Sequence, residues 1–181
     1  MRASVAEVGI AGSTFERVAA KAGVSRGLLH YYFGTKERLL IEVIRRDTEA
    51  RIEALGAALE AARTVDEVIG AFFGIFERTH AEQQGYAYLV SEVFVAGRHN
   101  PEVRAALAEP YERARSAFAE ILRAKEAEGV VDLRFDADSV LTYLFAAGDG
   151  AIIQRIIDAE RDFAAADAAA REVARFLLTV R

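Results

Sequence analysis

Apolar residues in this sequence recur at the spacing of an α-helix over almost its whole length. Side chains three and four positions apart share one face of a helix, so the pattern predicts amphipathic helices. The alternation of apolar and polar residues that indicates a strand is nearly absent. The best exception, residues 130–135, has no second segment with which it could pair. We therefore predict an all-α fold.

Capping signals divide the chain into about nine helices. A serine or threonine three residues before a glutamate is the capping-box spacing, and it occurs at Ser13 and again at Thr64. Further predicted N-caps are Ser25, Asn100, and either Asp136 or Asp138. The expected helices cover about residues 1–8, 13–21, 25–32, 36–62, 64 onward, 86–96, 101–128, 136–158 and 163–180.

Glycines and prolines give the expected ends of several helices. A glycine commonly follows the last residue of a helix because it adopts a left-handed backbone without strain. Gly9, Gly97 and Gly129 are therefore predicted stops. Pro110 is expected to kink or split the seventh helix, because proline has no N–H to donate to the preceding turn.

The charge of the chain is unevenly distributed. Its 181 residues carry a formal net charge of −5, which by itself disfavours binding to nucleic acid. Residues 1–46 nevertheless hold eight Lys or Arg against four Glu, whereas the remaining residues carry a net charge of −9. A phosphate backbone attracts the first segment and repels the second.

Residues 13–36 have the pattern of a helix-turn-helix. A short helix presents Phe15 and Val18 inward, and Gly23 supplies the backbone freedom of a tight turn. Val24 is expected to plug the corner between the helices. The next helix begins at once, and in this motif the second helix lies in the major groove of DNA.

The second helix of the motif has an unusual surface. Gly27 costs helix stability, but the missing side chain lets the backbone approach a duplex. Leu29 and Tyr32 take the inward spacing, so Tyr31 is expected to be exposed, and Phe33 is expected in the core. Hydroxyls and ring nitrogens can donate to phosphates, and arginine can reach guanine.

These residues resemble the TetR family of one-component bacterial regulators. The match covers about residues 3–46, and the resemblance implies a helix-turn-helix DNA-binding domain over 1–46 and a helical ligand-binding and dimerisation domain over 47–181. The third helix would read DNA, and Lys36 would contact a phosphate. The matching residues are Ser13-Thr14, Val18-Ala19, Ala22-Gly23-Val24-Ser25, Gly27, Leu29, Tyr32-Phe33, Lys36-Glu37 and Leu39-Leu40.

Two features depart from the family. His30 stands where the family usually has tyrosine, and the first helix is two to three turns shorter than usual. Either Met1 is an internal methionine of a longer natural chain, which is the interpretation we favour, or the DNA-binding domain is weakened. The candidate DNA contacts are Thr14, Arg26, Gly27, Leu28, His30, Tyr31, Tyr32 and Lys36.

The body matches the family mainly at residues 145–150. The resemblance implies that the eighth and ninth helices pair with their copies in a four-helix dimer interface, and small residues there do let helices approach closely. The alternative is an intramolecular core. The predicted interface residues are Ala147, Gly148, Ala151, Ile152, Arg155, Ile156, Phe176, Leu177 and Val180.

Aromatic side chains are dense in the body and suit an apolar or aromatic ligand, although any one of them could belong to the core. The fourth helix links the body to the DNA-binding domain. A bound ligand could therefore change the spacing of two such domains, which must lie about 34–36 Å apart to enter successive major grooves. The predicted pocket residues are Phe72, Phe76, Tyr88, Phe94, Tyr111, Phe118 and Tyr143.

Other chemistries find no support in the sequence. There is no cysteine, the three histidines His30, His80 and His99 are not at metal-ligand spacing, and no catalytic or phosphate-loop motif occurs. The N-terminus lacks the apolar core of a signal peptide, and polar residues interrupt the most apolar stretch, residues 140–157. We predict no metal, cofactor, enzymatic activity or membrane span, and a cytoplasmic location.

We therefore expect a ligand-responsive transcription regulator. In this hypothesis a homodimer represses by binding a palindromic operator in double-stranded DNA, and a small-molecule effector releases it. Two alternatives stay open. The chain could be a helical enzyme or ligand carrier whose helix-turn-helix is coincidental, or a dimerising adaptor that does not read DNA.

Overall fold

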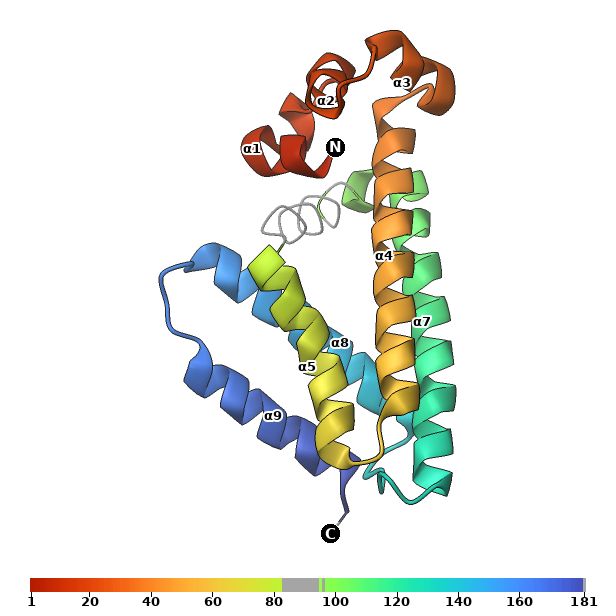
Figure 1. Cartoon of the computed structure of the whole chain (residues 1–181), viewed down its shortest axis with the longest axis vertical. Helices are drawn as coiled ribbons and strands as arrows, with labels where there is room; N and C mark the ends of the chain where they lie inside the picture. Colours follow the sequence, from red (N-terminus) through yellow and green to blue (C-terminus); the bar gives the residue numbers. More distant parts are fainter. Residues whose placement is uncertain (83–94, 96, 181) are drawn as a thin grey trace. The chain divides into compact units, whose positions relative to one another are not determined.

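The computed structural model describes residues 1–82, 95 and 97–180 of the chain. Within these ranges every regular element is an α-helix (Figure 1), which confirms the all-α prediction. The predicted sixth helix, residues 86–96, lies almost entirely outside the described residues. The described helices are α1 (Arg2–Gly12), α2 (Phe15–Ala22), α3 (Arg26–Phe33), α4 (Lys36–Ala61), α5 (Val65–Glu82), α7 (Pro101–Ala127), α8 (Ala137–Ile157) and α9 (Ala164–Leu178).

The chain divides into two compact units. The first contains Met1–Ala50 and Thr79–Pro110, and the second contains Arg51–Arg78 and Tyr111–Arg181. Helices α4, α5 and α7 therefore contribute residues to both units. The predicted boundary at residue 46 lies near this division within α4, whereas the assignment of Thr79–Pro110 to the first unit has no counterpart in the predicted domains.

Most predicted helix starts are confirmed by side-chain caps. Each cap accepts a hydrogen bond from an amide that has no partner within its own helix. Asp136, and not Asp138, is the cap of α8. The capping bonds join Ser25 Oγ to Leu28 N (3.1 Å), Thr64 Oγ1 to Glu67 N (3.2 Å), Asn100 Oδ1 to Val103 N (3.3 Å) and Asp136 Oδ1 to Ser139 N (3.0 Å).

Two predicted helix breaks are wrong. Gly97 is helical together with the next two residues, so it ends no helix. A Cβ at Gly97 would lie 3.5 Å from the Cα of Arg104, which is ordinary van der Waals contact, so this neighbour does not require glycine there. Pro110 does not split α7, which continues through it. Proline removes one hydrogen bond of a helix, and α7 stays continuous through the hydrogen bonds of its other residues. Gly129, in contrast, has φ 75° directly after the end of α7, as predicted.

The core of the second unit is formed by α5, α7, α8, α9 and the end of α4. Beside the end of α4 lies Lys125 of α7, which is only 4% exposed. Its Nζ donates to the carbonyl of Glu60 at 3.0 Å and to Oε2 of Glu128 at 3.1 Å, so it supplies a donor to the last turn of α4. The largest fully buried apolar side chains here are Leu59, Val68, Phe118, Leu122, Val140, Leu141 and Leu178.

Residues 130–135 form no strand but still find a backbone partner. The amides of Asp132 and Arg134 donate to the carbonyls of Leu178 and Leu177, at 2.9 and 3.0 Å. The last carbonyls of a helix have no partner within the helix. The segment that most resembled a strand therefore supplies hydrogen-bond donors to the last carbonyls of α9.

Candidate nucleic-acid interface

Helices α1, α2 and α3 pack with the start of α4 around a small core. Phe15 and Val18 of α2 and Leu29 of α3 are at most 8% exposed, and they meet Leu39 of α4. Phe33 is half-buried against the same cluster. These positions were predicted to be inward, and the cluster fixes α2 and α3 against each other.

A buried pair of serines holds the bend in α1. Gly9 has φ 67° and ψ 177°, a backbone conformation that favours glycine, and it interrupts the helix. Ser13 Oγ donates to the carbonyl of Gly9 at 2.8 Å and accepts from Ser4 Oγ at 2.9 Å. Ser13 is therefore a core residue, and the prediction that it caps α2 is wrong. Thr14 is the cap, because its Oγ1 accepts from the amide of Arg17 at 3.3 Å.

The turn between α2 and α3 is closed by backbone hydrogen bonds. Gly23 has φ 67° and ψ 26°, and its amide donates to the carbonyl of Ala20 at 3.3 Å. The amide of Val24 donates to the carbonyl of Ala19 at 3.0 Å, which completes a Schellman motif. Val24 is 37% exposed, so it does not plug the corner as predicted. The backbone bonds close this turn without an apolar plug.

Helix α3 exposes an aromatic face. Tyr31 is 82%, Tyr32 69% and Leu28 43% exposed, and the two tyrosine rings meet edge to face with centroids 5.1 Å apart. The prediction that Tyr32 points inward is wrong, because Leu29 and Phe33 occupy the inner side of α3. Within the chain, the nearest atom to a Cβ placed on Gly27 would be Ser25 Oγ at 3.9 Å, so no described neighbour requires glycine there.

His30 is exposed but braced on two sides. Its ring meets the ring of Phe15 edge to face, with centroids 4.5 Å apart and an interplanar angle of 88°. Its Nδ1 lies 3.3 Å from the carbonyl oxygen of Gly34, just beyond the end of α3. The imidazole therefore has a fixed orientation at the edge of the aromatic face.

Three arginines near helix starts of the first unit have no acidic partner within 4.0 Å among the residues described: Arg17, Arg26 and Arg38. Each lies in the first turn of its helix, in α2, α3 and α4 respectively. The helix dipole is positive at that end and disfavours a cation. A bound anion would stabilise both the guanidinium groups and the unpaired amides of these turns.

Lys36 has a partner that the sequence did not suggest. Its Nζ donates to the carbonyl of Ile10 at 3.0 Å, and the residue is half-buried. Lys36 thus links the first residue of α4 to the last turn of α1. A phosphate contact from Lys36 stays a prediction, and it would have to share the ammonium with this bond.

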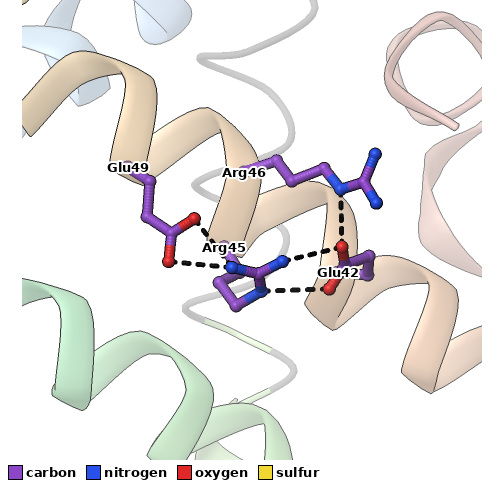
Figure 2. Close-up of polar contacts among 4 residues, drawn as sticks. All are labelled: Glu42, Arg45, Arg46 and Glu49. Atoms are coloured by element: carbon purple, nitrogen blue, oxygen red, sulfur yellow. Dashed lines mark hydrogen bonds and ion pairs between the residues drawn. The ribbon is translucent and has the colours of Figure 1, made fainter. Parts of the chain in front are cut away.

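Arg45 and Arg46 of α4 are neutralised by neighbouring carboxylates (Figure 2). Arg45 donates to both oxygens of Glu42, at 2.8 and 3.0 Å, and to both oxygens of Glu49, at 2.7 and 2.9 Å. Arg46 Nε donates to Glu42 Oε1 at 2.5 Å. The bonds from Arg45, and then that from Arg46, lower the pKa of Glu42 to about 2. Arg45 and Arg46 are therefore less available to an external anion than Arg38 at the start of the same helix.

The residues predicted for a dimer interface differ in exposure. Phe176 is 54% and Val180 47% exposed, whereas Leu177 is 9% exposed and belongs to the core of the second unit. Arg155 Nη2 lies 2.5 and 2.7 Å from the two carboxylate oxygens of Asp167, which joins α8 to α9 within one chain. Of the remaining positions, Ala147 is exposed and Gly148 is buried. The others are half-buried: Ala151, Ile152 and Ile156.

Apolar side chains project from α8 and α9 beyond the predicted set. Ile153 is 44% and Ile157 72% exposed on α8, and Val173 is 40% exposed on α9. Among the described residues, only α8 is long and apolar enough to cross a membrane by length and composition, and 22% of its most apolar window is buried. Ile153, Ile157, Val173 and Phe176 together are called the exposed stripe below.

The side chains of four predicted pocket residues are described, and they differ in burial. Phe72 and Phe118 are 3% and 2% exposed within the core, Tyr111 is half-buried and Tyr143 is 50% exposed. The structure does not describe the side chains of Phe76, Tyr88 and Phe94.

Tyr111 and Phe118 are joined through a ring that was not in the predicted set. Phe145 lies edge-on to both, with centroids 6.1 Å from each. The hydroxyl of Tyr111 donates to Oδ1 of Asp149 at 3.3 Å. Burial raises the pKa of Asp149, and the Tyr111 bond offsets part of that rise. A half-buried carboxylate is thus bonded to one ring of this aromatic cluster. Neither this region nor any other described part of the chain holds three His, Asp or Glu close enough to bind a metal ion.

Two family matches cover most of the chain. Residues 2–43 match the family described as bacterial regulatory proteins, tetR family, and residues 63–180 match the tetracyclin repressor-like C-terminal domain.

Individual proteins are similar over different lengths. The HTH-type transcriptional regulator BetI of Brucella melitensis is 34% identical over 89 residues, which are 47% of this chain and 45% of that protein. The chain thus spans about half the length of the curated relatives it matches. Regulator FadR of Bacillus subtilis in complex with stearoyl-CoA superposes with a TM-score of 0.80 at 20% identity, over 96% of this chain and 92% of that one. A regulator from Saccharomonospora viridis in complex with choline gives 0.75 at 23%, over 95% and 88%.

The two structures share the fold across nearly the whole chain, including the helix-turn-helix of α2 and α3 and the helices that follow it. The two family matches together cover residues 2–43 and 63–180. The chain belongs to the tetR family of bacterial regulatory proteins.

Proposed function

We propose that this chain is a transcription regulator that reads double-stranded DNA with α3. The observation that carries the proposal is the exposed face of Leu28, Tyr31 and Tyr32 beside arginines that have no acidic partner among the described residues. Side chains at the centre of such a face reach base edges, and cations at its borders reach phosphates. Arg26 is the residue best suited to a guanine, because guanidinium pairs with its two acceptors. We propose no catalytic activity.

We propose that two copies associate through α8 and α9. The exposed side chains of Ile153, Ile157, Val173 and Phe176 would be covered by the same surface of a second copy. Two α3 helices about 34–36 Å apart then fit successive major grooves, so the operator would be a palindrome. This assembly would work in the cytoplasm, where the DNA of a bacterium lies.

We propose that a small molecule binds in the second unit near Tyr111, Phe118 and Phe145 and releases the operator. Rings supply apolar contact, and Asp149 supplies one polar anchor. The ligand shifts the spacing of the two α3 helices only if it binds one spacing better than the other. Choline and stearoyl-CoA, which occupy the two solved neighbours, differ so much that they select no ligand for this chain.

The test is selection of bound duplexes from a random DNA pool, followed by measurement of the mass of the complex. We expect enrichment of a palindrome that carries two chains. Tyr31→Ala should abolish the enrichment, whereas Tyr143→Ala, which truncates an exposed tyrosine of the second unit, should keep it. A pool that stays random would favour a ligand carrier or an adaptor and would overturn the proposal.

A further inference from the structure

His30 lies at one edge of the DNA-reading face of α3. Successive residues of an α-helix are turned by about 100°, and Leu29 and Phe33 mark the inner side of α3. Tyr31 then points directly outward, in agreement with its 82% exposure. His30 and Tyr32 fall on opposite borders of this face. In a major groove, the borders of a recognition helix face the phosphates of the two strands.

The contacts of His30 restrict where its protons can be. A carbonyl oxygen only accepts hydrogen bonds, so the contact between Nδ1 and Gly34 requires that Nδ1 carries a proton. In a neutral imidazole the other nitrogen, Nε2, then presents a lone pair. A lone pair repels a phosphate oxygen. While the bond to Gly34 is kept, only the imidazolium form, with a proton on both nitrogens, can donate from Nε2.

We propose that His30 contacts a DNA phosphate only as the imidazolium, so that binding of DNA takes up a proton at this residue. This inference rests on the proposed DNA-binding function. It gives the chain a contact that weakens as the pH rises, whereas a tyrosine hydroxyl at the same position would donate at every pH below about 10.

The groups packed against His30 carry no negative charge. A DNA phosphate would therefore be the counterion of its imidazolium form. From α2 His30 is packed by the neutral ring of Phe15, and from the turn after α3 by the carbonyl of Gly34. No carboxylate of the described residues lies within 4.0 Å of it. The charged groups on the nearby elements are Glu16, Arg17 and Lys21 on α2, Arg26 one turn earlier on α3, and Lys36, Glu37 and Arg38 at the start of α4.

The consequence is a defined direction of pH dependence. Imidazole is the side chain whose charge changes between about pH 5 and 8. The charged form binds DNA better, so affinity should rise as the pH falls through this range. Each protomer can take up at most one proton at His30 when it binds DNA. The affinity can therefore change by at most about tenfold per pH unit for each protomer. One extra phosphate contact should also steepen the dependence of log affinity on log salt by about 0.9 at low pH.

The experiment measures affinity for the selected duplex by fluorescence anisotropy between about pH 5.5 and 8.5, at several salt concentrations. Wild-type chain should bind more tightly at low pH, with a steeper salt dependence there. His30→Gln and His30→Tyr keep a neutral donor and should remove the pH dependence of both quantities. His99→Gln, which changes an exposed histidine at the end of a helical segment just before α7, should behave as wild type. Circular dichroism at each pH verifies that all variants are folded.

The outcomes separate this inference from the proposed function. Binding of wild type that does not depend on pH, or a pH dependence that persists in His30→Gln, would overturn the role of His30 and leave the DNA-binding function standing. A wild-type chain that binds no duplex at any pH would overturn both. Loss of the pH dependence in His99→Gln would also contradict the assignment to His30.

Discussion

The ammonium of Lys36 donates to the backbone carbonyl of Ile10 across 3.0 Å. The bond ties the first residue of α4 to the last turn of α1, where the negative end of the helix dipole attracts a cation. A residue expected to contact DNA therefore has a structural partner of its own. The two roles differ in what they do to the salt dependence of DNA binding, so they can be separated.

Replacement of Lys36 by methionine should weaken both stability and DNA binding. The lost bond should lower the free energy of unfolding by about 1 kcal/mol, as measured in urea. A lost phosphate contact should in addition reduce the slope of log affinity against log salt by about 1. If the slope stays at the wild-type value while stability falls, Lys36 serves the fold alone and the phosphate contact is refuted.

Arg38 and Arg45 form a matched pair on α4. Arg38 lies in the first turn and has no acidic partner within 4.0 Å among the described residues, whereas Arg45 is held by Glu42 and Glu49. Arg38→Gln should therefore lower DNA affinity at every sequence and reduce the salt slope by about 1. Arg45→Gln should leave both close to wild type. Equal losses in the two variants, titrated on the same duplex, would mean that ion pairing in the free chain does not decide which arginine meets DNA.

Gly27 and Gly23 should respond to alanine in opposite ways. A Cβ at Gly27 meets no atom closer than 3.9 Å, and alanine favours the helix by up to about 1 kcal/mol, so Gly27→Ala should be as stable as wild type or more so. Its DNA affinity should nevertheless fall, because the added methyl group projects from the face that approaches the duplex. Gly23→Ala should lower stability by about 1–2 kcal/mol, since Gly23 has φ 67°. Thermal melting and anisotropy measure the two effects, and full DNA affinity in Gly27→Ala would show that glycine is not needed for contact.

The helix starts could be predicted from the sequence because capping is local. A hydroxyl or carboxylate accepts from an amide two or three residues later, and no distant residue is needed to recognise it. Ser25, Thr64 and Asp136 follow this rule. Ser13 does not, although it has the same spacing, because it bonds to Ser4 nine residues earlier in a buried pair. Only the packing of α1 against α2 decides between Ser13 and its neighbour Thr14.

The exposed face of α3 was predicted in part, and the sequence left open which aromatic residues of the second unit belong to the core. Tyr31 is outward as expected, but Tyr32 is also outward because Phe33 fills the core. In the second unit, Phe118 is a core residue, and Tyr111 is only half-buried and bonded to Asp149. Rings that line a ligand site and rings that fill the core have the same spacing along a helix. Sequence alone therefore cannot separate a ring that lines a ligand site from one that fills the core.

Asp149 should make the second unit less stable as the pH rises. Burial raises its pKa in the folded chain, so the folded state holds the proton more tightly than the unfolded state does. The free energy of unfolding should then decline from about pH 4 upward until the carboxyl is ionised in both states. Asp149→Asn removes the charge and keeps an acceptor for Tyr111, so its stability relative to wild type should increase over the same range. Glu160→Gln, at an exposed site, is the control. Urea melts at a series of pH values measure the difference, and a difference that does not vary with pH would contradict the assignment.

The exposed stripe on α8 and α9 gives the last prediction. Ile157 is 72% exposed, and burial of a whole isoleucine side chain in an interface contributes roughly 1.5–3 kcal/mol for each copy. Ile157→Glu would place a charge in that interface and should convert a dimer to a monomer at micromolar concentration. Phe135→Glu alters another exposed apolar residue of the second unit, which lies outside both helices, and should leave the dimer intact. Light scattering gives the mass, and DNA affinity should fall with the dimer, because a single α3 reads only half of a palindrome. If wild type is itself a monomer, or if Ile157→Glu remains dimeric, the two copies do not meet through this stripe.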